Sequence, residues 1–279
     1  MTTVDTIAPP SRLLAFTRRF AWLGVLILGV LSYVLVLRTL VRTDNPNFVP
    51  SLILLGSIVV PITVLVFAAS GGRRIVVPTG MVVFTAIAGG VIGTAAAGTV
   101  EYDTLQELGA LPMILVGLIE ESVKLIVPLL LLIVVRRPDP RAGVIIGVAS
   151  GMGFATLETM GYGFTALLNQ GSLAAVNQTL LLRALLSPAG HVAWTGLTVA
   201  AIWRIPTAAR KGRALGLAVL AFVAAVLLHA AWDGFNNVVV HIIVGGLSVT
   251  VLLIMIQHAH RVADTSPRTR RKGRTATGT

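Results

Sequence analysis

The chain has 279 residues, of which 55% are hydrophobic and 12% are charged, and its mean hydropathy is +0.88. This balance excludes an ordinary soluble globular protein, in which apolar and polar residues are nearly even. The net charge of +11 alone would suit a nucleic-acid binder, whereas the lack of cysteine excludes disulfides and thiolate chemistry.

Eight apolar stretches come close to the length of about 20 residues that a membrane-spanning helix needs. The first stretch lacks the small-residue cleavage pattern of a signal peptide, so we expect it to be retained. The sequence therefore predicts an all-α, polytopic transmembrane helix bundle over residues 20–260, with about eight spans. The spans are expected at residues 20–37, 48–69, 78–99, 111–135, 142–168, 185–203, 214–232 and 238–258.

The basic residues indicate which loops face the cytoplasm, because cytoplasmic loops carry an excess of lysine and arginine. With the N-terminus inside, eighteen of the 22 basic residues fall in cytoplasmic segments, and the opposite loops hold only Arg38, Arg42 and Arg183. Both termini are thus predicted to be cytoplasmic, as an N-terminal segment 1–19 and a basic tail 261–279. We expect the tail to be disordered and to lie near the lipid bilayer. Since membrane topology explains the charge, nucleic acid is not an expected partner.

Ionisable side chains inside the predicted spans require a separate explanation. A charged residue at mid-bilayer costs roughly 2.5–3.5 kcal/mol on insertion scales, so such groups must be paired, protonated, hydrated or bound to metal. Seven residues fall into this class. They are Glu120, Glu121 and Lys124 in the fourth span, Glu158 in the fifth, His191 in the sixth, and His229 and Asp233 at the end of the seventh.

Two short patterns place several of these groups on common helix faces. The sequence L-I-E-E-S-V-K-L-I puts Lys124 one turn after Glu120 and Glu121, so the ammonium can neutralise one carboxylate. The second carboxylate is then left without a partner of its own, which suits a general acid or base. His229 and Asp233 are i, i+4 neighbours that can share a hydrogen bond or a metal ion. The simpler alternative is that these groups only join helices.

The depth of each residue in the membrane can be counted from the nearest loop, since a helix rises about 1.5 Å per residue. This depth shows which of the ionisable residues can lie close together. The two glutamates of the fourth span lie near mid-bilayer, whereas Glu158, His191 and His229 lie in the outer half. The sequence predicts one pocket that opens outward, between the fourth and the seventh spans. The other three histidines do not match that level as well: His241, His258 and His260.

Carboxylates and imidazoles in a protected cavity can activate water, either directly or through a bound metal, so hydrolysis is the expected reaction. The H-E-x-x-H pattern is absent, so a metal site would be assembled from separate helices. Ser150 lacks the preceding glycine of a serine hydrolase motif and has no evident base. Two alternatives from other classes are a proton-coupled transporter and a non-catalytic membrane scaffold. The absence of two similar halves argues against the transporter.

The combination resembles the PrsW-type intramembrane proteases, which are related to the CAAX prenyl proteases. The resemblance covers residues 111–237 and rests on four features: E-E-S-V-K at 120–124, F-A-T-L-E at 154–158, His191, and H-A-A-W-D at 229–233. Thr159 stands where the family commonly has asparagine, which weakens the case for a polar role at that position.

This resemblance implies a peptidase that cleaves membrane-protein substrates, such as a membrane-bound anti-sigma factor, in a bacterial-type plasma membrane. It implies that Glu120 or Glu121 activates water and that Lys124 fixes their charge. Zn²⁺ is the expected cofactor, and a metal-free glutamate mechanism is the alternative. The implied metal ligands or oxyanion stabilisers are Glu158, His191 and His229, with Asp233 orienting His229 or joining the metal site.

Overall fold

The computed structural model describes residues 12–70, 77–135 and 138–262. Within these ranges the chain is helical and contains no strand, which confirms the all-α prediction. Most of the predicted segments 1–19 and 261–279 lies outside the described residues.

The helices follow one another through short connections. The α-helices and 3-10 helices (η) are α1 Arg12–Arg19, α2 Ala21–Thr43, η1 Pro46–Phe48, α3 Val49–Ser70, α4 Thr79–Leu108, α5 Met113–Val123, α6 Ile126–Val134, α7 Ala142–Gln170, α8 Leu173–Leu186, η2 Ser187–Ala189, α9 His191–Ile202, η3 Ile205–Thr207, α10 Lys211–Gly234 and α11 Val238–Val262.

Seven helical stretches in the described ranges are long and apolar enough to cross a membrane, so the chain is a multi-pass integral membrane protein. The stretch expected at 111–135 is instead divided into α5 and α6. The helix breaks because Pro128 has no N–H to donate to the carbonyl of Lys124, four residues earlier. Ser150 of α7 donates its hydroxyl to that carbonyl at 2.8 Å, which gives Ser150 a structural contact.

The expected sixth span also differs from its predicted limits of 185–203. The helix begins earlier, at Leu173, and the stretch runs through α8, η2, α9 and η3. Its regular α-helix is interrupted at the sequence S-P-A-G. Pro188 and the extended backbone of Gly190 end α8 and start α9 at His191. His191 therefore lies at the first position of a helix, at a break inside the bundle.

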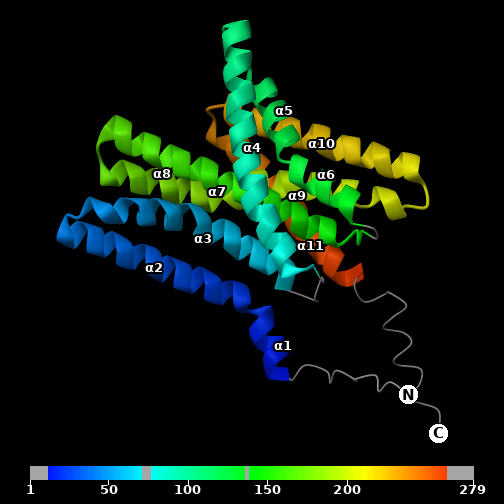
Figure 1. The fold of residues 1–279 in the computed structure, drawn as a ribbon, viewed down its shortest axis with the longest axis horizontal. Helices are drawn as coiled ribbons and strands as arrows, with labels where there is room; N and C mark the ends of the chain where they lie inside the picture. The colour runs from blue at the N-terminus through cyan, green and yellow to red at the C-terminus, as the bar shows by residue number, and fades with distance from the viewer. Residues whose placement is uncertain (1–11, 71–76, 136–137, 263–279) are drawn as a thin grey trace.

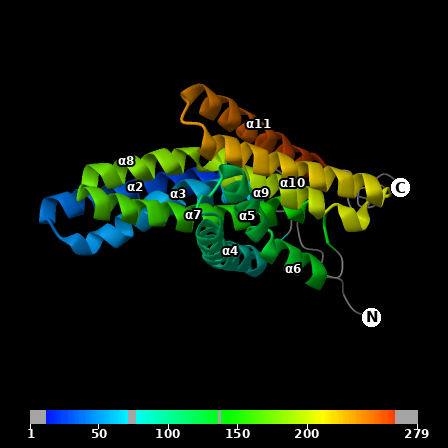
Figure 2. The same ribbon diagram turned by 90° about the horizontal axis from the view of Figure 1, so that it is seen from above.

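Helix α7 is the centre of the bundle and the most buried of its spans. It packs against α3, α4, α8 and α9. Figure 1 shows α2, α3, α7 and α8 running in similar directions while α4 crosses them steeply, and Figure 2 shows α11 and α4 on opposite faces of this layer. The turns between α2 and α3 and between α7 and α8 lie at one end, and the α9–α10 connection lies at the other.

Glycines set the two closest helix crossings. A β-carbon at Gly147 would lie 2.8 Å from the backbone of α9, and one at Gly153 would overlap the carbonyl oxygen of Ala86 on α4. Small residues at such crossings allow helix backbones to approach closely. These contacts determine which residues of α4, α7 and α9 face one another.

We predict that Gly153→Ala destabilises the protein by at least about 1–3 kcal/mol, because the added methyl group forces α4 and α7 apart. Gly161→Ala on the same helix is the matched control, since a β-carbon there would meet nothing within 4 Å. Thermal unfolding of the purified protein in detergent measures both effects. Equal melting temperatures for the two variants would contradict this crossing.

Candidate functional site

Lys124 lies at the centre of the buried polar cluster and is completely buried. Its Nζ lies 3.0 Å from Glu120 Oε2 and 2.8 Å from Glu121 Oε1. The sequence analysis expected one carboxylate without a partner, whereas the single ammonium contacts both. The ammonium also lies 4.2 Å from the centre of the Phe154 ring, a cation–π contact. One side chain thus compensates the charge of two carboxylates away from water.

His191 connects the cluster to α7. Its Nδ1 lies 2.7 Å from Lys124 Nζ, and its Nε2 lies 2.9 Å from Glu158 Oε2. Because an ammonium can only donate, Nδ1 accepts from Lys124, and the ring proton belongs on Nε2, toward the Glu158 carboxylate. The partners therefore define the tautomer of His191.

His229 of α10 lies between three carboxylates. Its Nδ1 is 3.0 Å from Glu121 Oε1, and its Nε2 is 3.0 Å from Asp233 Oδ2, the i, i+4 neighbour. The Nε2 atom is also 3.6 Å from Glu120 Oε2. The cluster thus joins α5, α7, α9 and α10, the helices on which the sequence analysis placed its pocket.

Aromatic rings hold both imidazoles in place. Trp194 stacks on His229 with ring centres 5.0 Å apart, and it meets His191 edge-on at 5.6 Å. Its indole N–H donates to Ser248 of α11 at 2.9 Å. Phe154 also packs edge-on against His191, with ring centres 5.4 Å apart. The side chains around the two histidines therefore restrict rotation of their rings.

Two further charged residues belong to the cluster although the sequence analysis did not include them. Arg183, expected in an outer loop, lies on α8 with its Nη2 2.7 Å from Glu158 Oε2. Glu101 lies beyond the predicted end of the third span, but α4 continues past it to Leu108. Its Oε1 is buried, has no hydrogen-bond partner among the described residues, and lies within electrostatic range of Glu120. A charge near a span end was the only sequence signal for either residue.

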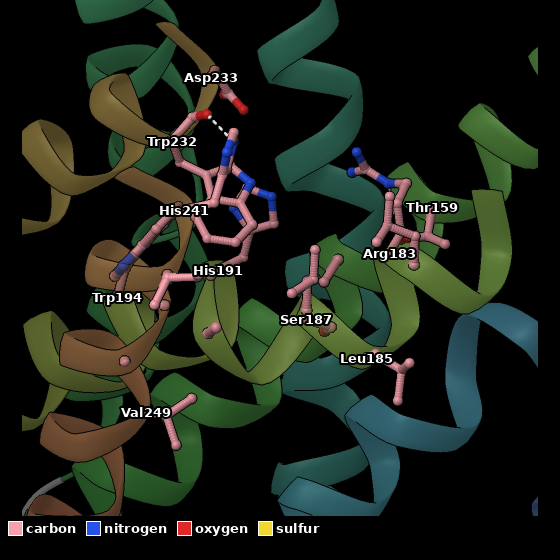
Figure 3. A pocket seen from close by; sticks show the side chains of 18 of the residues that line it. Thr159, Arg183, Leu185, Ser187, His191, Trp194, Trp232, Asp233, His241 and Val249 are labelled. Atoms are coloured by element: carbon pink, nitrogen blue, oxygen red, sulfur yellow. Dashed lines mark hydrogen bonds between the residues drawn. The ribbon is translucent and has the colours of Figure 1, made fainter. Parts of the chain in front are cut away.

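A cavity of about 780 Å³ lies beside the cluster, between α7, α8, α9, α10 and α11. Figure 3 shows His191, Trp194, Asp233 and His241 on one side of it and Arg183 on the other. Asp233 has 38% of its side chain exposed, whereas the Glu121 side chain is only 2% exposed and lies behind the wall. His241, which the depth argument excluded, also lines the cavity, because α11 begins beside the end of α10.

Three residues are placed to hold a metal ion. One ligand atom each from Glu120, His191 and His229 can be chosen so that all lie within 4.8 Å of one another. Glu120 Oε2 lies 3.6 Å from His229 Nε2 and 3.9 Å from His191 Nδ1. Ligand atoms around tetrahedral zinc lie about 3.3–3.5 Å apart, so small side-chain movements would close the site. Glu158 and Asp233, both expected as ligands, instead contact the histidines.

The charge of the cluster also fits a cation. In the described part of the chain two cationic side chains, Lys124 and Arg183, face an excess of carboxylates. A divalent ion would offset most of the remaining negative charge, and both imidazoles have carboxylates on their ring nitrogens, as metal-binding histidines usually do. The carboxylates are Glu101, Glu120, Glu121, Glu158 and Asp233.

Carboxylates and imidazoles that are buried in a membrane bundle beside a cavity are the groups that an intramembrane hydrolase needs. The model of the PrsW family intramembrane metalloprotease matches residues 60–259. The chain therefore belongs to this family, and its assignment as a membrane peptidase is confirmed. No match was found among curated proteins or among solved structures.

We predict that Lys124→Met destabilises the protein by about 3–5 kcal/mol, because two buried carboxylates lose their shared cation. Adding Glu121→Gln should restore part of this loss, since it removes one of the uncompensated charges. Lys211→Met, at an exposed position at the start of α10, is the control. Denaturant unfolding of the three variants tests the ion pair, and wild-type stability of Lys124→Met would contradict it.

Proposed function

We propose that this peptidase holds a zinc ion with Glu120, His191 and His229 and uses it to hydrolyse peptide bonds of membrane-protein substrates. The observation that carries the proposal is the convergence of these three ligand atoms from α5, α9 and α10 next to a cavity. The choice of zinc rests on the donors, two imidazole nitrogens and one carboxylate oxygen. When bound, the metal supplies Lewis-acid activation of water and of the scissile carbonyl.

The remaining members of the cluster orient these ligands. Glu121 accepts a hydrogen bond from His229 Nδ1–H, so a metal would bind at Nε2, which lies 3.6 Å from Glu120 Oε2 and 3.0 Å from Asp233 Oδ2. Glu158 faces His191 Nε2–H, so a metal would bind at Nδ1 in place of the Lys124 ammonium that donates to this nitrogen. Lys124 offsets the charge of the two glutamates. This division of roles gives Glu121 and Glu158 the function of carboxylates that fix a metal-binding imidazole.

Asp233 is proposed as the general base. It lines the cavity and is far more exposed than Glu120 or Glu121, so it can reach a water molecule and a substrate. Glu121 is too buried for this role, because its Oε1 contacts both Lys124 and His229. The proposal thus changes the expectation that Glu120 or Glu121 is the base.

The cavity suits an apolar polypeptide segment. Most of its lining is hydrophobic, and its charged groups are concentrated near the cluster. A site that binds apolar side chains and cleaves the backbone needs this arrangement. Its walls include the end of α10 and the start of α11, and the distribution of lysine and arginine among the loops favours an outer-side position for the connection between them, in a bacterial-type plasma membrane. A membrane-bound anti-sigma factor would present a suitable segment there.

We predict that Glu120→Gln loses both metal and activity, whereas Asp233→Asn keeps the metal but lowers kcat by about 10²–10⁴-fold, the usual contribution of a general base. Elemental analysis and cleavage of a labelled membrane substrate measure the two properties. His258→Gln, at an exposed position on α11, is the control and should change neither. Full activity of metal-depleted protein would contradict the zinc site.

The substrate class has its own test. We expect membrane-protein fragments that accumulate with the wild-type enzyme to be absent with Glu120→Gln at equal expression. Their new termini should lie within or beside predicted spans on the outer side. Mass spectrometry of membrane fractions identifies the fragments, and identical fragment patterns for both proteins would contradict proteolysis at this cluster.

A further inference from the structure

Arg183 contacts three residues on two successive turns of α7. Its Nη2 lies 2.7 Å from Glu158 Oε2, and its Nε donates to Thr159 Oγ1 at 3.4 Å. The guanidinium carbon lies 3.8 Å from the centre of the Tyr162 ring. A guanidinium is planar and stacks on aromatic rings while pairing with a carboxylate at its edge, which a lysine ammonium cannot reproduce. Arg183 is thus fixed against α7 from the far wall of the cavity.

The same oxygen of Glu158 is shared between Arg183 and His191. It lies 2.9 Å from His191 Nε2, on the other side from the guanidinium contact. Neither contact has regular hydrogen-bond geometry, so this buried oxygen is held mainly by its attraction to the charged guanidinium. Glu158 has a side chain only 19% exposed, so water does little to replace a lost partner. Its position therefore depends on Arg183.

From this arrangement we propose that Arg183 is a positioning residue, which holds the Glu158 carboxylate against His191 Nε2 and so fixes the orientation of the imidazole ring. It does not touch the ligand atoms itself, and it acts on the site through the chain Tyr162, Arg183, Glu158 and His191. In its effect on metal binding, the inference rests on the proposed function. Its effect on the position of Glu158 does not, because the contacts with Arg183 and His191 are present without a metal.

Thr159 supports this role at a position where the family resemblance suggested none. Its hydroxyl accepts from Arg183 Nε and so completes the contact surface for the guanidinium. Thr159 is buried and adjacent in sequence to Glu158, so one arginine holds both residues. The polar function expected of asparagine in the family pattern is here a contact with Arg183.

Nitrogen NMR of the full-length protein in detergent tests the proposal directly. The chain has five histidines, so ¹⁵N-imidazole labelling with a His191→Gln variant assigns the His191 signals. In chelator-treated wild-type protein we expect the Nε2–H tautomer alone. Arg183→Gln should shift the Nε2 resonance, because the carboxylate that faces it is released, whereas Arg183→Lys should shift it less, because it keeps the charge without the planar stacking. Arg42→Gln, exposed at the end of α2, is the matched control.

Zinc affinity, measured by chelator competition on the same proteins, gives the second result. We expect Arg183→Gln and Glu158→Gln each to weaken binding by about 10–100-fold, and the double variant to be no weaker than Glu158→Gln. If wild-type protein bound no zinc while the His191 Nε2 resonance still responded to Arg183, the proposed metal site would fail and the positioning role would stand.

An unchanged His191 Nε2 resonance in folded Arg183→Gln would overturn the inference. So would additive losses of zinc affinity in the double variant, because Arg183 and Glu158 would then act independently. An increase in KM alone, with the Nε2 resonance and zinc affinity as in wild type, would identify Arg183 as a substrate-binding residue instead. Should Arg183→Gln fail to fold, Arg183→Lys and Tyr162→Leu carry the same comparison.

Discussion

The site depends on one constraint, the cost of placing charge where neither water nor solvent ions can compensate it. The ammonium of Lys124, fully buried, meets this constraint by contacting two carboxylates and an imidazole. The helix break that Pro128 causes lies at the same residue, so Lys124 also needs a partner for its carbonyl oxygen, which Ser150 supplies. Side chain and backbone of one residue thus connect α5 to α7 and α9.

The order of polar groups around this cation separates a rigid interior from an accessible edge. Glu121 and His229 are almost completely buried and contact each other, whereas Asp233 and Arg183 lie at the cavity. Glu120 lies between these two sets. Catalysis in a membrane requires such a gradient, because the metal-binding groups need fixed geometry and the reacting groups need water and substrate.

The sequence alone predicts the all-helical architecture, because this follows from the length of the apolar stretches. It also predicts the four helices that carry the cluster, because these follow from the depth of each ionisable residue along its helix. It was not sufficient for contacts between helices. Spacing within one helix indicates that Lys124 can reach Glu120 and Glu121, but the pairing of Glu158 with His191 and Arg183 depends on helix crossings. Glycines such as Gly153 determine those crossings, and a single sequence does not show which backbone each glycine meets.

X-ray absorption at the zinc edge of the purified, active protein is the most direct test of the central claim that this cluster binds a catalytic metal. The account predicts about one zinc per chain with light-atom ligands at about 2.0–2.1 Å and the multiple-scattering signal of two imidazoles. Loss of one imidazole signal in His229→Gln would identify the ligand. Active protein without zinc, or zinc coordinated without any imidazole, would contradict the account.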